Sequence, residues 1–253
     1  MSGADAEVVL VRRDGDVAVI TLNRPQARNA MNAALAAATC EAVGACQDAG
    51  AIVITGADPA FCAGLDLRNL GIDKLVDLPP FLAAVADSQV PVIAAVNGPA
   101  VTGGFELALV ADFIVASERA AFADTHLRVG VYPGPVAVEL PRRVGLARAR
   151  EMSLTGNFVD AQTALRIGLV NHVVAHDELL ARATELASAI AEQDRDMVRA
   201  LRRDWRESAG LPLDEASRVH YEHATRGGFT GAAGADIAAR RDAVIQRART
   251  QRG

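Results

Sequence analysis

The sequence has few aromatic residues, a single lysine and no long hydrophobic run. Aromatic residues make up 4% of the 253 positions, so the core must be built from alanine and aliphatic side chains. Lys74 is the only lysine, and the arginines are scattered rather than clustered. The net charge is −5, and together with the scattered arginines it argues against nucleic acid as a partner. The absence of any run of about 18 apolar residues predicts no membrane-spanning segment.

Targeting, redox and nucleotide-binding motifs are also missing. The first ten residues, MSGADAEVVL, have neither a basic start nor an apolar centre, so we expect no secretory signal. The three cysteines, Cys40, Cys46 and Cys62, form no CxxC pair, which is typical of a reduced, cytoplasmic protein. No GxGxxG or phosphate-loop motif occurs, so neither a nicotinamide nor an ATP cofactor is predicted.

Two histidine pairs have spacings that metal ligands can adopt. His172 and His176 lie in a strand-like segment, where a spacing of four does not define one face. His220 and His223 have a helical spacing, with Glu222 beside them, but no further ligand motif. We therefore predict no metal site.

What the sequence does contain is an alternation of strands and helices, followed by helices alone. Short apolar runs predict strands at 17–22, 52–55, 90–96 and 113–116. Asn32 can cap a helix from Ala33 to about Asp48. Further helical patterns cover 105–111, 136–141, 145–155, 161–167, 177–193 and most of 195–253. This order predicts a mixed α/β core over 1–195 and a helical region over 196–253.

Two segments repeat one local plan. IVITGADPAFCAGLDL at 52–67 and VIAAVNGPAVTGGFELAL at 92–109 each run from a strand through a Gly/Pro loop into a helical pattern. If the strands were parallel neighbours, the loops would meet and present backbone N–H groups at helix starts. Two convergent N–H donors form an oxyanion hole, and small residues let a substrate oxygen approach them. Two ordinary strand-to-helix turns are the alternative.

Four stretches of the chain resemble the crotonase superfamily, also called the enoyl-CoA hydratase/isomerase family. They are TLNRPQARNAMN at 21–32, ITGADPAFCAGLDL at 54–67, the stretch from PVIAAVNGP to VYPG at 91–134, and TGNFVDAQTALRIGLVNHVV at 155–174. The resemblance implies an α/β spiral of repeated strand–strand–helix turns with a C-terminal helical extension. It also implies a homotrimer or dimer of trimers built through that extension, and an acyl-CoA thioester bound between the two loops.

The resemblance assigns binding roles to three segments. Ala63 and Gly103 match the two oxyanion donors, whose N–H groups would stabilise an enolate oxygen. The substrate loop continues through Gly64, Leu65 and Asp66. The segment that approaches the CoA adenine and phosphates is matched by Ala27, Arg28 and Ala30; Arg28 has the charge that a phosphate requires, although a surface ion pair would also explain it.

The catalytic residues match the family in one position and depart from it in another. Glu106 matches the first catalytic glutamate, and it lies three residues after Gly103, on one side of a helix. Burial in its apolar stretch would raise the pKa of Glu106 into a range useful for proton transfer. Hydratases carry a second glutamate where this chain has His126, a residue that can accept and donate protons near neutral pH.

Three neighbours of His126 complete the predicted site. Asp124 could orient His126 or act as an acid itself, and a position in a surface loop is the alternative. Tyr132 could line the pocket or belong to the core. Gly134 matches the family glycine near the water site.

The predicted function is hydration of a 2-enoyl-CoA, with no cofactor other than the CoA thioester that serves as substrate. Because the second glutamate is replaced, two alternatives stay open. One is a Δ3-Δ2 enoyl-CoA isomerase, in which Glu106 alone moves a proton. The other is an acyl-CoA-binding homologue that has lost turnover but keeps the oxyanion hole.

Overall fold

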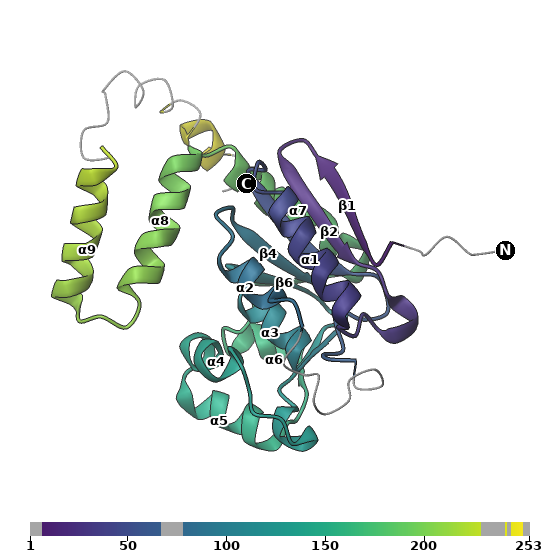
Figure 1. Cartoon of the computed structure of the whole chain (residues 1–253). Helices are drawn as coiled ribbons and strands as arrows, with labels where there is room; N and C mark the ends of the chain where they lie inside the picture. The colour runs from purple at the N-terminus through teal and green to yellow at the C-terminus, as the bar shows by residue number, and fades with distance from the viewer. Residues whose placement is uncertain (1–6, 67–77, 229–240, 242–243, 250–253) are drawn as a thin grey trace. The chain divides into compact units, whose positions relative to one another are not determined.

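The computed structural model describes residues 7–66, 78–228, 241 and 244–249. The chain divides into two compact units, Met1–Gln193 and Asp194–Gly253 (Figure 1). The first unit holds two β-sheets and the helices that cover them, and the second is helical over its described residues.

A large sheet forms the centre of the first unit. Its strands, in spatial order, are β1 (Val9–Asp14), β2 (Val17–Leu22), β3 (Ala51–Gly56), β4 (Val92–Val96), β6 (Phe113–Ser117) and β9 (His172–Val174). The first pair is antiparallel, and every later neighbour is parallel. The four predicted strands are confirmed, since β2 has the predicted bounds and β3, β4 and β6 differ from them by one or two residues.

A small, three-stranded sheet contains the second strand of the strand–strand–helix repeats. It contains β5 (Pro99–Val101), β7 (Ala121–Ala123) and β8 (Val159–Asp160). The chain passes from β4 to β5 and then into helix α3 (Gly103–Leu109), and from β6 to β7 and then toward helix α4 (Val136–Val144). Each repeat thus places one strand in each sheet before a helix, which confirms the expected spiral of strand–strand–helix turns.

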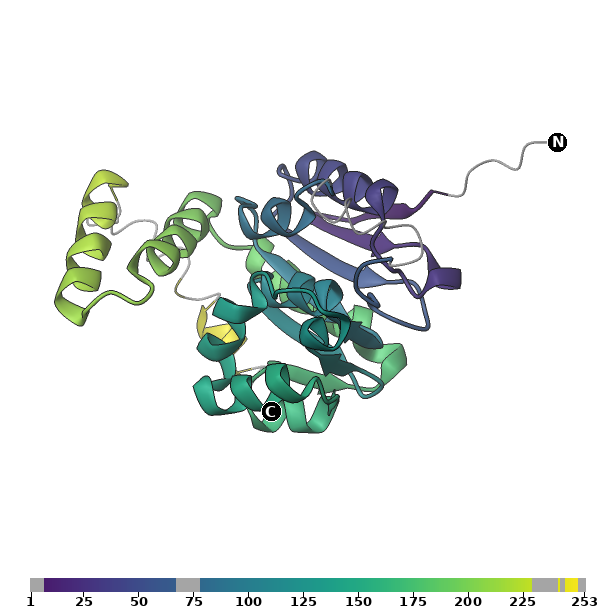
Figure 2. The same cartoon turned by 60° about the horizontal axis from the view of Figure 1, so that its bottom comes forward.

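Helices cover both faces of the large sheet (Figures 1 and 2). Side chains alternate along each strand, so Val17 and Val19 of β2 pack toward helix α7 (Leu179–Ala191). Ala18 and Ile20 belong to the core on the opposite face, together with α1 (Ala33–Ala45), α2 (Phe81–Ala86) and α3. Because both faces are buried, β3 and β4 are apolar along almost their whole length.

The remaining elements of the first unit are short. They are the helices α5 (Leu146–Thr155) and α6 (Ala161–Arg166) and the 3-10 turns η1 (Pro25–Ala27), η3 (His126–Val129) and η4 (His176–Glu178). The predicted cap of α1 is confirmed, since Asn32 accepts a hydrogen bond from the Leu35 amide at 2.9 Å.

The second unit contains the helices α8 (Arg195–Ser208) and α9 (Leu213–Arg226), joined through residues 209–212. Asp204 of α8 is buried and accepts hydrogen bonds from the rings of His220 and His223 of α9. The histidine pair of this unit therefore serves to join two helices. Among the helices that the structure describes, none is both long and apolar enough to cross a membrane.

Candidate active site

A cavity of about 490 Å³ opens between α2, α3 and the loop that follows β7. Its polar wall includes Glu106 and His126, and Leu65 and Gly103 lie beside them. Most of the remaining lining is apolar and is formed by Leu78, Pro79, Pro80, Phe81, Leu82, Ala83, Ala86 and Val110. An apolar cavity with a few converging polar groups is the usual form of a small-molecule site.

The two loops that follow β3 and β4 meet at this cavity. The parallel pairing of β3 with β4 continues into the loops, where the Cys62 amide donates to the Pro99 carbonyl and the Val101 amide to the Cys62 carbonyl. Two glycines permit the contact. A Cβ on Gly64, whose φ is +91°, would lie 2.0 Å from Thr102 Oγ1, and a Cβ on Gly104 would lie 2.1 Å from the Cys62 carbonyl oxygen. The predicted meeting of the loops is present.

The structure changes which amide of the first loop can serve as an oxyanion donor. The N–H of Ala63 donates to the Arg28 carbonyl at 3.0 Å, so the predicted donor is already occupied. The Met31 amide donates to the Gly64 carbonyl and the Asp66 amide to the Met31 carbonyl. These two bonds flank Leu65, whose own N–H therefore points away from Met31. Leu65 also lines the cavity, so its N–H is a better candidate for the first oxyanion donor than the N–H of Ala63.

The second amide comes from Gly103 at the start of α3. N–H groups in the first turn of a helix have no partner within that helix. Gly103 lines the cavity, and a Cβ added to it would lie 3.7 Å from Leu65 Cδ2, so the two donors belong to one place. Thr102 before it has a φ of +46°, which a residue other than glycine rarely adopts.

Glu106 lies in the first turn of α3 and is 4% exposed. Burial raises the pKa of its carboxyl, although the charge of His126 and the backbone amides of Val136 and Gly134 oppose that shift. The Val136 amide donates to Glu106 Oε1 at 3.3 Å. A Cβ on Gly134 would lie 2.9 Å from the same oxygen, so the absence of a side chain lets this loop close over the carboxylate.

Asp124 and His126 form a buried pair beside Glu106. The ring Nδ1 of His126 lies 2.7 Å from Asp124 Oδ1, which also accepts from the His126 amide at 3.3 Å. The ring Nε2 lies 3.6 Å from Glu106 Oε2. Burial opposes charge on the imidazole, but the Asp124 hydrogen bond and the Glu106 charge outweigh it and raise the pKa of His126. Asp124 thus contacts the ring that it is predicted to orient, and because it is buried, the alternative of a position in a surface loop is wrong.

The pKa of Asp124 is held below its ordinary value. Burial would raise it, but hydrogen bonds from the side chain and backbone of His126 outweigh that effect. The Asp124 carboxylate is thus the acceptor, and Nδ1 of His126 carries a proton. This arrangement leaves Nε2 as the ring atom that faces Glu106 and the cavity.

Other predicted residues have different surroundings. Asp66 is buried in an ion pair with Arg24 at 3.1 Å, so it anchors the loop that Arg24 begins. Arg28 is exposed, and Ala27 and Ala30 beside it are half-buried. Tyr132 is 88% exposed and does not line the cavity, so both of its predicted placements are wrong.

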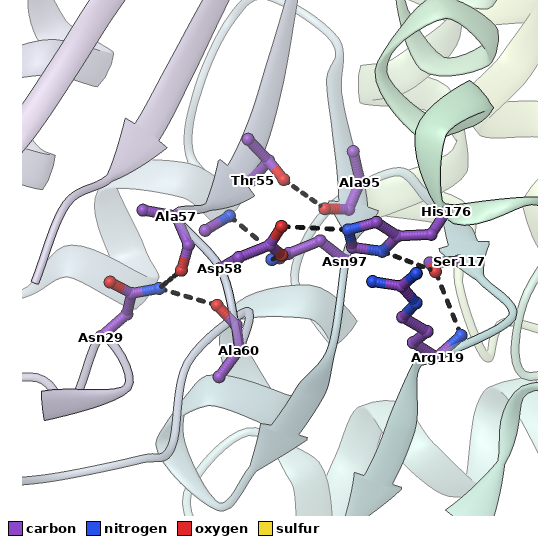
Figure 3. Close-up of polar contacts among 11 residues, drawn as sticks. Asn29, Thr55, Ala57, Asp58, Ala60, Ala95, Asn97, Ser117, Arg119 and His176 are labelled. Atoms are coloured by element: carbon purple, nitrogen blue, oxygen red, sulfur yellow. Dashed lines mark hydrogen bonds and ion pairs between the residues drawn. The ribbon is translucent and has the colours of Figure 1, made fainter. Parts of the chain in front are cut away.

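A polar network that the sequence did not indicate connects the first loop to segments far from it in the chain (Figure 3). Asp58 accepts from Asn97 Nδ2 at 2.8 Å, and its other oxygen lies 3.0 Å from His176 Nε2. Asn29 donates to the carbonyls of Ala57 and Ala60 at 2.8 and 2.7 Å. Polar residues in a Gly/Pro loop are the only local signal for such a network, because the partners come from segments far apart in the sequence.

Metal ligation has no support among the residues described, which contain no group of three His, Cys, Asp or Glu side chains able to hold an ion. His176 of the first histidine pair contacts Asp58 and Ser117 instead. His172, the other member, is half-buried in β9.

Known proteins share both the sequence and the fold of this chain. A probable enoyl-CoA hydratase of Rhizobium meliloti (strain 1021) is 46% identical over 195 residues, covering 73% of this chain and 76% of the relative. Carnitinyl-CoA dehydratase of Salmonella typhi is 37% identical over 224 residues, covering 84% and 85%. The crystal structure of an enoyl-CoA hydratase from Mycobacterium avium superposes with a TM-score of 0.73 at 43% identity, covering 91% of this chain and all of that one.

The sequence profile described as enoyl-CoA hydratase/isomerase matches residues 12–226, most of the chain. The match includes every strand from β2 onward and all of the residues that surround the cavity. The chain therefore belongs to the enoyl-CoA hydratase/isomerase family, and its candidate active site has a histidine beside Glu106.

Proposed function

We propose that this protein is an enoyl-CoA hydratase, which adds water across the 2,3-double bond of a 2-enoyl-CoA thioester. The observation that carries the proposal is one cavity in which Glu106 and His126 face each other beside the Leu65 and Gly103 amides. This combination supplies proton transfer and oxyanion stabilisation at the same place.

The thioester carbonyl binds at the meeting point of the two loops. As water adds to C3, negative charge moves onto the carbonyl oxygen, and the N–H groups of Leu65 and Gly103 stabilise the enolate. Removing one such donor from an enzyme costs roughly 3–4 kcal/mol of transition-state stabilisation. Leu65 replaces Ala63 in this role, because the Ala63 N–H is bonded to Arg28.

Glu106 and His126 share the proton transfers. The Glu106 carboxylate accepts a proton from water as its oxygen bonds to C3. The His126 imidazolium, held by Asp124, donates a proton to C2 of the enolate. Transfer of the proton from Glu106 back to His126 restores the starting state, so the pair ends each cycle with one proton, as it began. The 3.6 Å between Nε2 and Oε2 places the two groups close enough for this exchange, directly or through a water.

The remaining surfaces suit an acyl-CoA and no separate cofactor. The apolar wall from Leu78 to Ala86 provides space for an acyl chain. Arg28 is an exposed cation available to a CoA phosphate. Its backbone carbonyl accepts a hydrogen bond from Ala63, so it lies next to the substrate loop. The CoA thioester is then the substrate, and the chemistry proposed above uses groups of the chain and water alone.

We further propose that residues 196–253 form an oligomerisation region, that the protein is a homotrimer or a dimer of trimers, and that it works in the cytoplasm. Large apolar side chains are exposed on the second unit taken alone, among them Trp205, Leu213 and Tyr221. Light scattering during size-exclusion chromatography tests the assembly. A monomer would contradict this part of the proposal.

Hydration is tested by mixing the purified protein with crotonyl-CoA and following the loss of the enoyl-thioester absorbance. The same protein is incubated in parallel with a 3-enoyl-CoA. Loss of the first absorbance supports the proposal. Conjugation of the 3-enoyl substrate without hydration would identify an isomerase, and tight binding without either turnover would identify an acyl-CoA-binding protein.

A further inference from the structure

We propose that His176 is a positioning residue for the oxyanion hole: it holds Asp58, and through Asp58 the loop that carries the Leu65 amide. The inference rests on the proposed function, because it assigns the loop its catalytic use. His176 follows β9 and lies outside the cavity lining, so its effect on the reaction is indirect.

The first step is the contact of Asp58 with two other segments of the fold (Figure 3). Asp58 belongs to the loop after β3, and its Oδ1 accepts from Asn97, the first residue after β4. Its Oδ2 lies 3.0 Å from Nε2 of His176, which is 118 residues away. The carboxylate therefore joins the two oxyanion loops to each other and to the turn between β9 and α7.

The second step is the orientation of the His176 ring. Its Nδ1 lies 3.1 Å from Oγ of Ser117, a fully buried residue at the end of β6. Ser117 Oγ already accepts from the Arg119 amide at 3.0 Å, so its hydroxyl proton is available for Nδ1. The ring then carries its own proton on Nε2 and donates it to Asp58, which satisfies all three groups.

The pKa of Asp58 agrees with this direction of donation. Burial opposes the charge, but the hydrogen bonds from Asn97 and His176 and the charge of Arg119 outweigh it, so the pKa of Asp58 lies below its ordinary value. Asp58 is thus the acceptor at both of its oxygens.

The third step is the path from Asp58 to Leu65. The Gly56 amide donates to Asn97 Oδ1, and Asn29 holds the carbonyls of Ala57 and Ala60. The next residues run against β5, where Cys62 pairs with Ala100. These contacts hold residues on either side of Asp58, and the Asp58 carboxylate holds the turn between them. We expect its release to loosen this turn and so to change the spacing between the Leu65 and Gly103 amides. Small misplacement of aligned groups lowers catalysis strongly.

The test compares His176→Ala and His176→Gln with a control, His172→Ala. The Gln amide nitrogen can reach the position of Nε2, whereas Ala removes the contact. His172 lies four residues away on β9, and the hydrogen bonds to Asp58 come from Asn97 and His176. We expect His176→Ala to lower kcat for crotonyl-CoA by about 10-fold, with KM nearly unchanged, and His176→Gln to recover most of that loss.

A spectroscopic readout measures the oxyanion hole itself. A bound 2,4-hexadienoyl-CoA absorbs at longer wavelength when hydrogen bonds polarise its carbonyl. We expect His176→Ala to reduce this shift and His176→Gln to restore it. An unchanged kcat and an unchanged shift in His176→Ala would overturn the proposal, as would equal losses in His172→Ala.

A third measurement needs no substrate. Hydrogen–deuterium exchange should become faster in residues 56–66 of His176→Ala and stay unchanged in β2 and α7. Faster exchange throughout the first unit would show a general loss of stability and would overturn the positioning role. If the unsubstituted protein hydrates no enoyl-CoA, the proposed function fails, and exchange still decides whether His176 holds the loop.

Discussion

The first unit contains two aspartate–histidine pairs that have similar geometry, one in the candidate active site and one outside its cavity. Asp124 and His126 approach to 2.7 Å, and Asp58 and His176 to 3.0 Å. In the first pair the remaining ring nitrogen faces Glu106 in a cavity. In the second pair the remaining nitrogen faces the Ser117 hydroxyl in the interior.

The comparison shows that the group facing the second ring nitrogen determines whether an aspartate–histidine pair can take part in proton transfer. The Ser117 hydroxyl, which accepts from the Arg119 amide, contacts one ring nitrogen of His176, and Asp58 contacts the other, so neither nitrogen faces a substrate. A carboxylate with a raised pKa leaves His126 in a proton-sharing pair at the wall of a pocket. Four experiments, ordered by expected effect, test this contrast.

The largest effect should come from Glu106→Gln, which removes the carboxylate from the first pair. We expect kcat for crotonyl-CoA to fall by about 10³-fold, because Gln cannot accept the proton of water. Glu151→Gln is the control, since Glu151 is exposed on α5 in an ion pair with Arg148. Turnover within a few-fold of the original would remove Glu106 from the mechanism.

The second experiment makes the same change in both pairs. His126→Gln should lower kcat by about 10²-fold, because the amide cannot carry and return a proton. His176→Gln should keep most of the activity, because it needs only to donate a hydrogen bond. Equal losses in the two variants, measured by the same absorbance assay, would contradict the contrast between the pairs.

The third experiment replaces each aspartate by asparagine, in separate variants, and follows the pH profile of kcat/KM. The proposed mechanism needs protonated His126, so activity falls as pH rises through its raised pKa. Asp124→Asn removes the hydrogen-bonded charge that raises this pKa, so the alkaline limb should move to lower pH. Asp58→Asn should leave the limb in place. A limb that stays fixed in Asp124→Asn would assign it to another group.

The smallest effect concerns stability. Burial raises the pKa of Glu106 in the folded protein, so the folded state binds this proton more tightly than the unfolded state does. The folded protein is therefore destabilised as the pH rises from the pKa of Glu106 in the unfolded chain through its pKa in the folded protein. Glu106→Gln avoids this destabilisation. We expect the melting temperature of Glu106→Gln at pH 7.5 to be higher than that of the original protein, and each 1 kcal/mol of added stability corresponds to about 2–4 °C in a chain of this size. A lower melting temperature than the original would contradict the destabilising role of burial.

Much of the fold could be predicted because its central strands are continuously apolar. The bounds of β2 and the cap of α1 follow from local residues. The strand β1 was missed, since its sequence VLVRRD is largely exposed at the sheet edge and lacks an apolar run. The three-residue strands β5 and β7 were also missed, because their pairing depends on tertiary contacts rather than on local pattern.

The site was predictable where a motif fixes a side chain and less so where the backbone matters. Glu106 and His126 lie together in the cavity, as their motifs indicated. The motif predicts Ala63 rather than Leu65 as the donor, because a sequence motif does not show that the Ala63 N–H is hydrogen-bonded to the Arg28 carbonyl. His176 was considered only as a metal ligand, since its partner Asp58 is 118 residues away in the chain.

The parallel order of the large sheet has a consequence for how the protein reaches its active form. β2, β3, β4 and β6 are neighbours in space but are separated by long stretches of chain, so each pairing closes a large loop and folding is correspondingly slow. The residues of the candidate site are spread over the chain from Arg28 to Val136, and they come together only when β2–β3, β3–β4 and β4–β6 have paired. No early local structure can contain it, so the return of hydration during refolding would report completion of the whole sheet.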